Sequence, residues 1–138
     1  FVGNGIRLDN GVIVKDPSFQ SSNFTAGSEP MYAVEALGTE MGNTTVKISL
    51  PTNAADGTKY EFICKCVGGL GMPPEMASYS GIVVFKCAAG NGSINGDTSS
   101  EFTVATATGP GATDYQHCTA VYSDDFNTWF VTEEAMAA

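Results

Sequence analysis

The chain has 138 residues, of which 43% are hydrophobic and only 15% are charged. This length suits one domain with a buried core, and the apolar content excludes a disordered chain. The formal net charge is −9, and all six Lys and Arg residues precede position 87. Nucleic acids and anionic membrane surfaces require clustered cations, so the composition excludes both as partners. No apolar run reaches the roughly 18 residues of a membrane span, so we expect none.

The N-terminal region divides into an apolar segment and a polar one. Residues 6–15 hold apolar side chains on both sides of Asn10-Gly11, which favours a β-hairpin because its turn requires positive φ at two residues. The alternative is one long extended arm with a bulge at Gly11. Residues 18–30 are small and polar, which predicts a linker. The chain is therefore expected to have three parts: an N-terminal strand arm or hairpin (1–17), a linker or loop (18–30) and a β-sandwich body (31–138).

The body has the pattern of successive short strands. In residues 59–66, Tyr60, Phe62, Cys64 and Cys66 alternate with other positions, as in a strand with one buried face. Further segments with strand character are 31–37, 44–50, 81–87, 101–107, 116–122 and 127–132. With the N-terminal segment these make about eight or nine strands, and no useful length of amphipathic helix is present. The expected fold is all-β: an antiparallel β-sandwich, either immunoglobulin-like or jelly-roll-like.

Four cysteines, Cys64, Cys66, Cys87 and Cys118, predict two disulfides that staple the sandwich. Cys64 and Cys66 lie two apart on one strand, where their side chains diverge, so we do not expect them to bond to each other. Each would then bond Cys87 or Cys118, and both pairings remain open. Metal binding is less favoured because the cysteines are scattered and His117 is the sole histidine. We therefore expect no metal and no cofactor.

Three sequons for N-glycosylation occur, at Asn23, Asn43 and Asn91. The chain begins with Phe1 rather than Met, which fits removal of a leader or trimming of the chain. An even number of cysteines, together with the sequons, is typical of an oxidising extracellular setting. The sequence therefore predicts a secreted or cell-surface protein that carries covalent glycans.

No motif in the chain indicates a catalytic reaction. A Ser-His-Asp triad would have to use His117, and no Gly-X-Ser-X-Gly motif is present to hold the nucleophile. Asp124, Asp125, Glu133 and Glu134 could supply a glycosidase pair, but acidic residues in turns are normally solvated. The sequence therefore predicts a protein that is not an enzyme.

Two non-catalytic classes remain, and the first is a structural subunit. A detached apolar segment can leave its own domain and add a strand to the open sheet edge of a neighbour. The apolar residues of this arm are Ile6, Leu8, Val12, Ile13 and Val14. The main prediction is a secreted homopolymer, in the form of an extracellular filament or a surface layer. The competing interpretation of the same residues is an ordinary intramolecular hairpin.

The second class is an extracellular module that binds a glycan or a protein, such as a surface antigen or a carbohydrate-binding domain. Trp129 and Tyr122 would form its aromatic platform. Trp129 and Val131 share one face of a strand and Phe130 takes the other, so one of these faces should be buried. A single Trp in a sandwich is more often a core residue than a platform.

Overall fold

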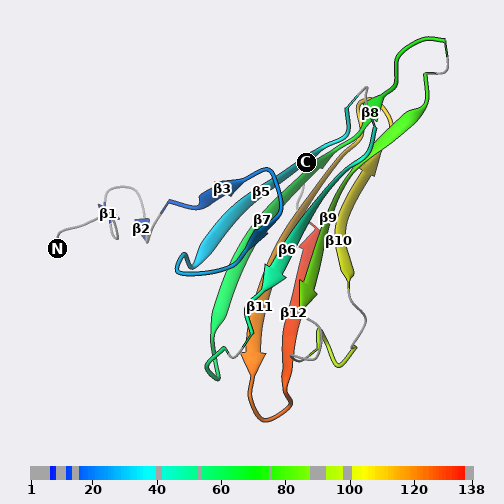
Figure 1. Ribbon diagram of the computed structural model, residues 1–138. Coiled ribbons are helices and arrows are strands. Elements are labelled where there is room, and N and C mark those ends of the chain that lie inside the picture. The colour runs from blue at the N-terminus through cyan, green and yellow to red at the C-terminus, as the bar shows by residue number, and fades with distance from the viewer. Residues whose placement is uncertain are drawn as a thin grey trace.

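The computed structural model is an all-β structure with a body of two layered sheets (Figure 1). It describes residues 7–8, 12–13, 16–39, 42–52, 54–74, 76–87, 93–97 and 101–135. Over these residues, no helix is long and apolar enough to cross a membrane. The strands are β1 (Arg7–Leu8), β2 (Val12–Ile13), β3 (Ser18–Gln20), β4 (Phe24–Thr25), β5 (Met31–Leu37), β6 (Thr44–Leu50), β7 (Lys59–Val67), β8 (Gly69–Leu70), β9 (Ser78–Cys87), β10 (Phe102–Thr108), β11 (Thr113–Ser123) and β12 (Thr128–Ala135).

The body consists of two five-stranded sheets. One has the order β12-β11-β7-β5-β3, and the other has the order β10-β9-β6-β4 with β8 paired to the start of β9. The predicted all-β fold with two sheets is confirmed, but the prediction of purely antiparallel strands is wrong. Strands β3, β5 and β7 run parallel, and so do β4, β6 and β9. From β3 to β7 the chain alternates between the two sheets. Strands β3, β4 and β5 therefore each pair with the strand two positions further along the chain, and the two run in the same direction.

Residues 18–30, which the sequence predicts to be a linker, contain two short strands of the body. β3 pairs with β5 and β4 pairs with β6, and residues 21–23 cross from one sheet to the other. Beyond β4, Ala26 is only 1% exposed and donates its N–H to the carbonyl of Ser49 at 3.0 Å. We call residues 18–27 the N-terminal hook. Its strands contribute two or three residues each, too few to show a period of two among polar neighbours.

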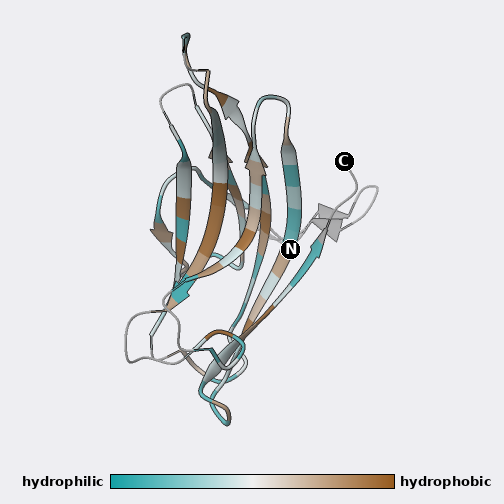
Figure 2. Cartoon of the chain, turned by 90° about the vertical axis from the view of Figure 1, so that its right-hand side faces the viewer, coloured by the Kyte–Doolittle hydropathy of each residue, from teal (hydrophilic) through white to brown (hydrophobic). Residues whose placement is uncertain are grey.

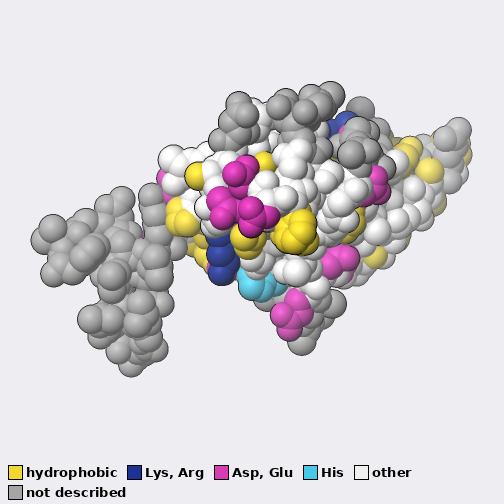
Figure 3. All heavy atoms as spheres, turned by 90° about the horizontal axis from the view of Figure 1, so that it is seen from below, with side chains coloured by type: hydrophobic (Ala, Val, Ile, Leu, Met, Phe, Trp, Pro, Cys, Tyr) yellow, Lys and Arg dark blue, Asp and Glu magenta, His cyan; other side chains and the backbone are white. Residues whose placement is uncertain are grey.

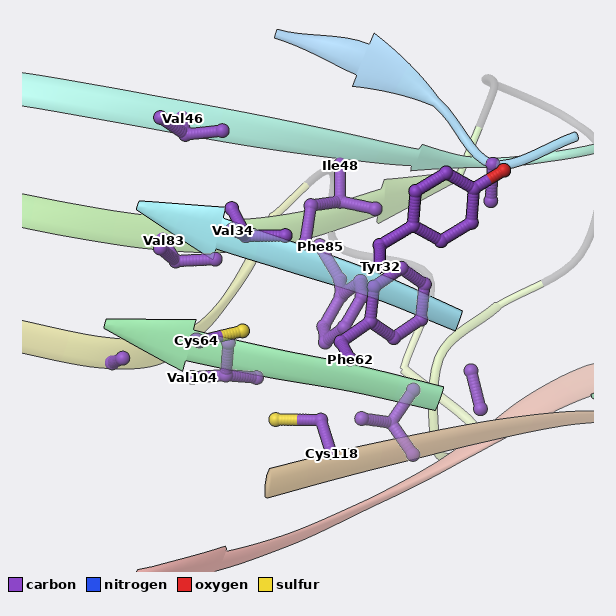
Figure 4. Close-up of a cluster of buried hydrophobic side chains, with 14 of the residues drawn as sticks. Tyr32, Val34, Val46, Ile48, Phe62, Cys64, Val83, Phe85, Val104 and Cys118 are labelled. Atoms are coloured by element: carbon purple, nitrogen blue, oxygen red, sulfur yellow. The ribbon is translucent and has the colours of Figure 1, made fainter. Parts of the chain in front are cut away.

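The core lies between the two sheets and is built around aromatic rings. Tyr60, Phe62, Cys64 and Cys66 are all buried, as their alternation predicts. Phe62 meets the ring of Phe85 edge to face, with centroids 4.9 Å apart, across the space between the sheets (Figure 4). The hydropathy colours show the same arrangement, with hydrophobic segments along the central strands (Figure 2). Burial of these faces is the main force that holds the layers together.

Two tyrosines tie the N-terminal hook to this core. The hydroxyl of Tyr32 accepts the N–H of Gly27 at 2.8 Å, and the hydroxyl of Tyr60 donates to the carbonyl of Gly27 at 2.9 Å. Both rings belong to the aromatic cluster, where Tyr32 stacks on Phe62 with centroids 5.6 Å apart. The hook is therefore held by apolar packing and by satisfied backbone groups, as part of the body.

The two sheets converge where β5 and β7 end and β9 begins. A Cβ atom on Gly81 would clash with the carbonyl oxygen of Ala36 and would lie 2.7 Å from that of Val67. In the same region Gly38 donates its N–H to the carbonyl of Val67 at 2.7 Å. Only glycine allows backbones from opposite sheets to approach this closely. We call this the glycine end, and the opposite end, where β11 turns into β12, the hairpin end.

Replacing Gly81 with Ala should therefore destabilise the fold. The added methyl group must displace backbone from two strands, and overpacking of this kind costs about 1–3 kcal/mol or more. Chemical denaturation would measure the loss. The control is Gly27→Ala, where the new Cβ would meet nothing closer than 3.9 Å and stability should change by about 0.5 kcal/mol or less. Equal stability of the two variants would contradict the convergence of the sheets.

Candidate assembly surface

Strands β1 and β2 form a small antiparallel sheet of their own. Arg7 pairs with Ile13 and Leu8 pairs with Val12, which leaves three residues between the strands. In Figure 1 this pair lies to one side of the body. The structure thus has the N-terminal segment as a hairpin rather than as one extended strand. Ile6 and Val14, the other predicted arm residues, lie outside the described residues.

Assembly by strand addition needs an unsealed sheet edge, because edge strands present N–H and C=O groups that can pair with another chain. The body has four edges: β12 and β10, and the two that the N-terminal hook covers through β3 and β4. How each is sealed decides where a further strand could be added.

The edge of β12 is sealed by residues 93–97. Ser93 accepts the N–H of Trp129 at 2.8 Å, and Asn95 donates its N–H to the carbonyl of Trp129 at 2.8 Å. The Asn95 side chain then pairs with both backbone groups of Val131, accepting at 2.8 Å and donating at 3.1 Å. Its amide thus takes the place of another peptide group. The next outward-facing position is Glu133, whose charge discourages strand pairing.

The edge of β10 is closed by the strand that follows it. Asp114 accepts the N–H of Thr106 through Oδ2 at 3.2 Å. Residues 109–112 carry the chain directly from β10 into β11 of the other sheet, and Gly109 donates its N–H to the carbonyl of Tyr79 at 3.1 Å. The two sheets are therefore linked on this side by the bond between Asp114 and Thr106 and by the short connection, which occupy the β10 edge near Thr106.

The hook seals only part of the remaining side. β4 pairs with Ile48 and Ser49 of β6, and Asn23 accepts the N–H of Lys47 through Oδ1 at 2.8 Å. Between there and the glycine end, nothing in the described structure pairs with the outer edge of β6 from Thr44 to Val46.

The equivalent stretch of β5 is also only partly covered. β3 pairs with Tyr32, Ala33 and Val34, and β5 continues beyond them to Leu37. This stretch carries Glu35, which forms an ion pair with Lys65 on the outer face at 3.6 Å. The open stretch of β6 carries no charge. The two edges therefore differ in how well they are protected against pairing.

The four cysteines do not form the two predicted disulfides, because no two of them lie at bonding distance. Cys64 and Cys118 lie on the adjacent strands β7 and β11, offset by two positions in register, and both side chains point into the core (Figure 4). Cys66 instead contacts the backbone of Val83. Cys87 lies four residues further along β9, which corresponds to about 13 Å of strand. An even number of cysteines therefore did not imply suitable geometry.

The surroundings of Cys64 and Cys66 keep their thiols protonated. The pKa of Cys66 rises to about 12, first because burial disfavours the thiolate and then because Asp114 is nearby. The pKa of Cys64 is also raised, chiefly by its hydrogen bond with Cys118 and then by burial. Thiols in this state are poor nucleophiles and poor metal ligands.

Two of the three sequons lie in the described structure, and both asparagines are exposed. Asn23 uses its oxygen to accept the N–H of Lys47, and Asn43 uses its oxygen to accept the N–H of Ser80 at 2.7 Å. Neither bond involves Nδ2, the atom that carries an N-linked glycan. Asn91 lies outside the described residues.

The proposed aromatic platform is not exposed. Trp129 is fully buried and packs against Tyr60 and Tyr122, with ring centroids 5.9 and 5.4 Å away. A ring without exposed surface cannot stack on a sugar, so Trp129 is a core residue here. Tyr122 is half-buried and donates its hydroxyl to Asn127 at 2.9 Å.

An exposed aromatic pair that the sequence analysis did not single out lies at the hairpin end. Phe126 is 73% exposed and Phe130 is 44% exposed, and their rings meet edge to face with centroids 6.0 Å apart. Viewed from below, hydrophobic and acidic side chains lie side by side at this end (Figure 3). Two Phe residues four apart across a predicted turn were the only signal in the sequence.

The comparisons with known proteins leave these features to be interpreted from the structure. The chain matches no protein-family model, and none of the curated proteins is significantly similar to it.

The seal on β12 should depend on the amide nitrogen of Asn95. In Asn95→Asp the side chain can still accept the N–H of Val131, but a carboxylate oxygen replaces the donor and faces a carbonyl. We expect a loss of about 1–3 kcal/mol in unfolding free energy. Asn127→Asp is the matched control, because Asn127 also has positive φ and its oxygen only accepts from Tyr122. Equal losses in both variants would contradict the proposed seal.

Alkaline pH should weaken the fold through Cys66. The pKa of its thiol is about 12 in the folded chain and 9.0 ordinarily. The stability that the protonated thiol contributes is therefore complete below pH 9 and is lost as the pH rises toward 12. The loss should be about 1.4 kcal/mol per pH unit. Urea denaturation between pH 8 and 10.5, with reductant, should show a shallower fall for Cys66→Ala than for the parent chain. If stability falls equally steeply with pH in both chains, Cys66 makes no such contribution, and the stability lost at pH 7 through the cavity left by Cys66→Ala does not affect this comparison.

Proposed function

We propose that this protein is a secreted, non-catalytic structural subunit that self-assembles into an extracellular filament or surface layer by donating its N-terminal strand to a neighbour. The observation that carries the proposal is the separate two-stranded sheet of β1 and β2, which stands outside the two sheets of the body. A hairpin this small is marginally stable in water. Pairing with a larger sheet would therefore be favourable for this segment.

The composition of the arm supports donation. Ile6, Leu8, Val12 and Val14 are apolar, and each such side chain stabilises by roughly 1.5–3 kcal/mol when it is fully buried. Ordering each residue costs about 1–2 kcal/mol. Burial of alternate side chains together with main-chain hydrogen bonds can offset that cost. The strand addition thus uses chemistry that the arm has and that a plain linker lacks.

The setting we propose is extracellular, with N-linked glycans at the sequons. Asn23 and Asn43 are exposed on the body, and their nitrogens take no part in the bonds that hold the side chains in place. A glycan at either position would lie on the surface without displacing a core residue. Few charges and many small polar residues fit a subunit whose surfaces contact copies of itself.

Removal of residues 1–15 should convert the assembled protein into a folded monomer of about 13 kDa, since residues of average size weigh roughly 110 Da and the full chain weighs 14.4 kDa. Electron microscopy of natively isolated protein should show fibres or sheets, and the truncated chain should show neither. Analytical ultracentrifugation would give the mass. Assembly by the truncated chain would contradict strand donation.

A point-substituted arm provides a sharper comparison than truncation. Replacing Ile6, Leu8, Val12 and Val14 with Ser keeps the length of the arm but removes its apolar side chains, so assembly should be lost. Replacing Arg7 and Lys15 with Ser is the control, and it should leave assembly intact because these side chains supply charge rather than apolar surface. If the control alone blocks assembly, electrostatic attraction rather than strand burial drives it.

A second candidate function is a protein-binding module, which the exposed pair of Phe126 and Phe130 favours. Exposed aromatic side chains are characteristic of protein interfaces. In this case a chain with both residues changed to Ser would still assemble but would lose its partner. The loss of assembly in that variant would instead place the pair at a contact between subunits.

A further inference from the structure

Building on the proposed function, we propose that the acceptor for the donated strand is the outer edge of β6 from Thr44 to Val46 in a second copy of this chain. The donated strand would run antiparallel to β6. The occupant is thus residues 6–15 of a neighbouring subunit, and the interface joins two different surfaces of identical chains.

The backbone of β6 presents the groups that this pairing needs. Lys47 donates its N–H outward to Asn23, and Ser49 accepts outward from Ala26. Backbone direction in a strand repeats every two residues, so Thr45 also directs its N–H and C=O outward. No bond to these two groups occurs within the described part of the chain. They are therefore available to an added strand.

The other edges are less suitable. Asn95 seals β12 at Val131, Asp114 occupies the outward N–H of Thr106 on β10, and β5 carries Glu35 beyond the reach of β3. The stretch from Thr44 to Val46 holds β-branched, uncharged residues, which favour strand pairing. Within the described residues, this stretch is thus protected neither by a side chain nor by a charge.

The position of the arm fits an acceptor on a neighbouring copy. Ser18 pairs with Tyr32 near the start of β5, so the chain before β3 leaves the body toward the hairpin end. β6 begins at the opposite, glycine end. When copies stack end to end in one orientation, the arm of one copy reaches the open edge of the next. A heterologous contact of this kind repeats without closing and produces a filament.

The length and direction of the arm fit this arrangement. Fifteen extended residues span up to about 50 Å, whereas the nine residues of β7 span about 30 Å. The arm would enter the neighbour at its glycine end, with residue 15 near that end and residue 6 farther along toward the hairpin end. The chain direction from residue 6 to residue 15 is therefore toward the glycine end. β6 runs from the glycine end toward the hairpin end, so the two strands would be antiparallel.

The core beneath the acceptor is already complete. Val46 and Ile48 are fully buried in the single chain. The added strand would therefore not be needed to complete the core: it would add main-chain hydrogen bonds at the edge, and its inward-facing apolar side chains would pack over the rim of that core. The acceptor subunit should consequently fold and remain soluble before assembly.

The first test is a proline at the acceptor edge. Thr45→Pro removes the outward N–H, and proline is tolerated on the free side of an edge strand; because it also removes the sequon at Asn43, it is compared with the parent chain after enzymatic removal of N-linked glycans. We expect a folded chain, by circular dichroism and thermal melting, that no longer forms sedimentable polymer. Glu133→Pro, at an outward position of β12, is the matched control and should assemble normally. Normal assembly of Thr45→Pro, with loss of assembly in Glu133→Pro, would place the acceptor on β12 and overturn the inference.

A second test does not depend on how proline affects folding. Thr45→Cys is combined in turn with Val12→Cys, Ile13→Cys and Val14→Cys, in a Cys87→Ser background. We expect at least one pair to give a ladder of cross-linked multimers on non-reducing gels. Thr132→Cys, on the exposed face of β12, replaces Thr45→Cys in the control and should give none. Cross-links confined to single chains would show that the arm folds back on its own β6, and would overturn the inference.

These outcomes separate the acceptor from the proposed function. If removal of residues 1–15 abolishes polymers but neither test involves Thr45, strand donation stands and the acceptor lies elsewhere. If polymers survive the removal, strand donation itself is wrong.

Discussion

The fold depends on parallel pairing between strands that are not consecutive in the sequence. β5 joins β7 and β6 joins β9, both in parallel. Parallel neighbours cannot be connected by a tight hairpin, so from β3 to β7 the chain crosses to the opposite sheet after each strand. At the glycine end these crossings bring backbones from the two layers into contact: a Cβ on Gly81 would clash with Ala36, and one on Gly38 would lie 3.0 Å from the backbone of Ser80. The parallel pairing of strands within each sheet thus accompanies a close approach of the two sheets at the glycine end.

This topology leaves sheet edges that the chain seals partly with short segments and partly with side chains. Asn95 on β12, Asp114 on β10 and Asn23 on β6 each satisfy an outward backbone N–H. A polar side chain can do this without presenting a new edge, whereas an added strand always presents one. The N-terminal hook covers part of the remaining side and stops short of Thr44. The proposed assembly would use the stretch that these seals leave, with the chain's own N-terminal residues as the missing strand.

The burial of individual residues could be predicted from the sequence, whereas their partners could not. Alternation in residues 59–66 correctly placed Phe62 in the core, and the position of Trp129 opposite Phe130 correctly suggested its burial. The hook was missed because β3 and β4 are short and polar. The disulfides were predicted from the number of cysteines, but Cys66 lies against Val83 and far along β9 from Cys87. The candidate acceptor could not have been found from the sequence, because Thr45 differs from other strand residues only in having, within the described structure, no strand or side chain paired with its outward backbone groups.

By itself, the sequence determined that the chain is all-β and which face of residues 59–66 is buried. Those properties are local, because the side chains of a strand alternate whatever its neighbours are. The tertiary structure decided which strands are neighbours, whether they run parallel, and which edges are sealed. Sheet pairing is made by backbone groups that every residue except proline carries alike, so the sequence holds little information about partners. The packing of the two layers against each other selects among the pairings that the backbone would accept equally well.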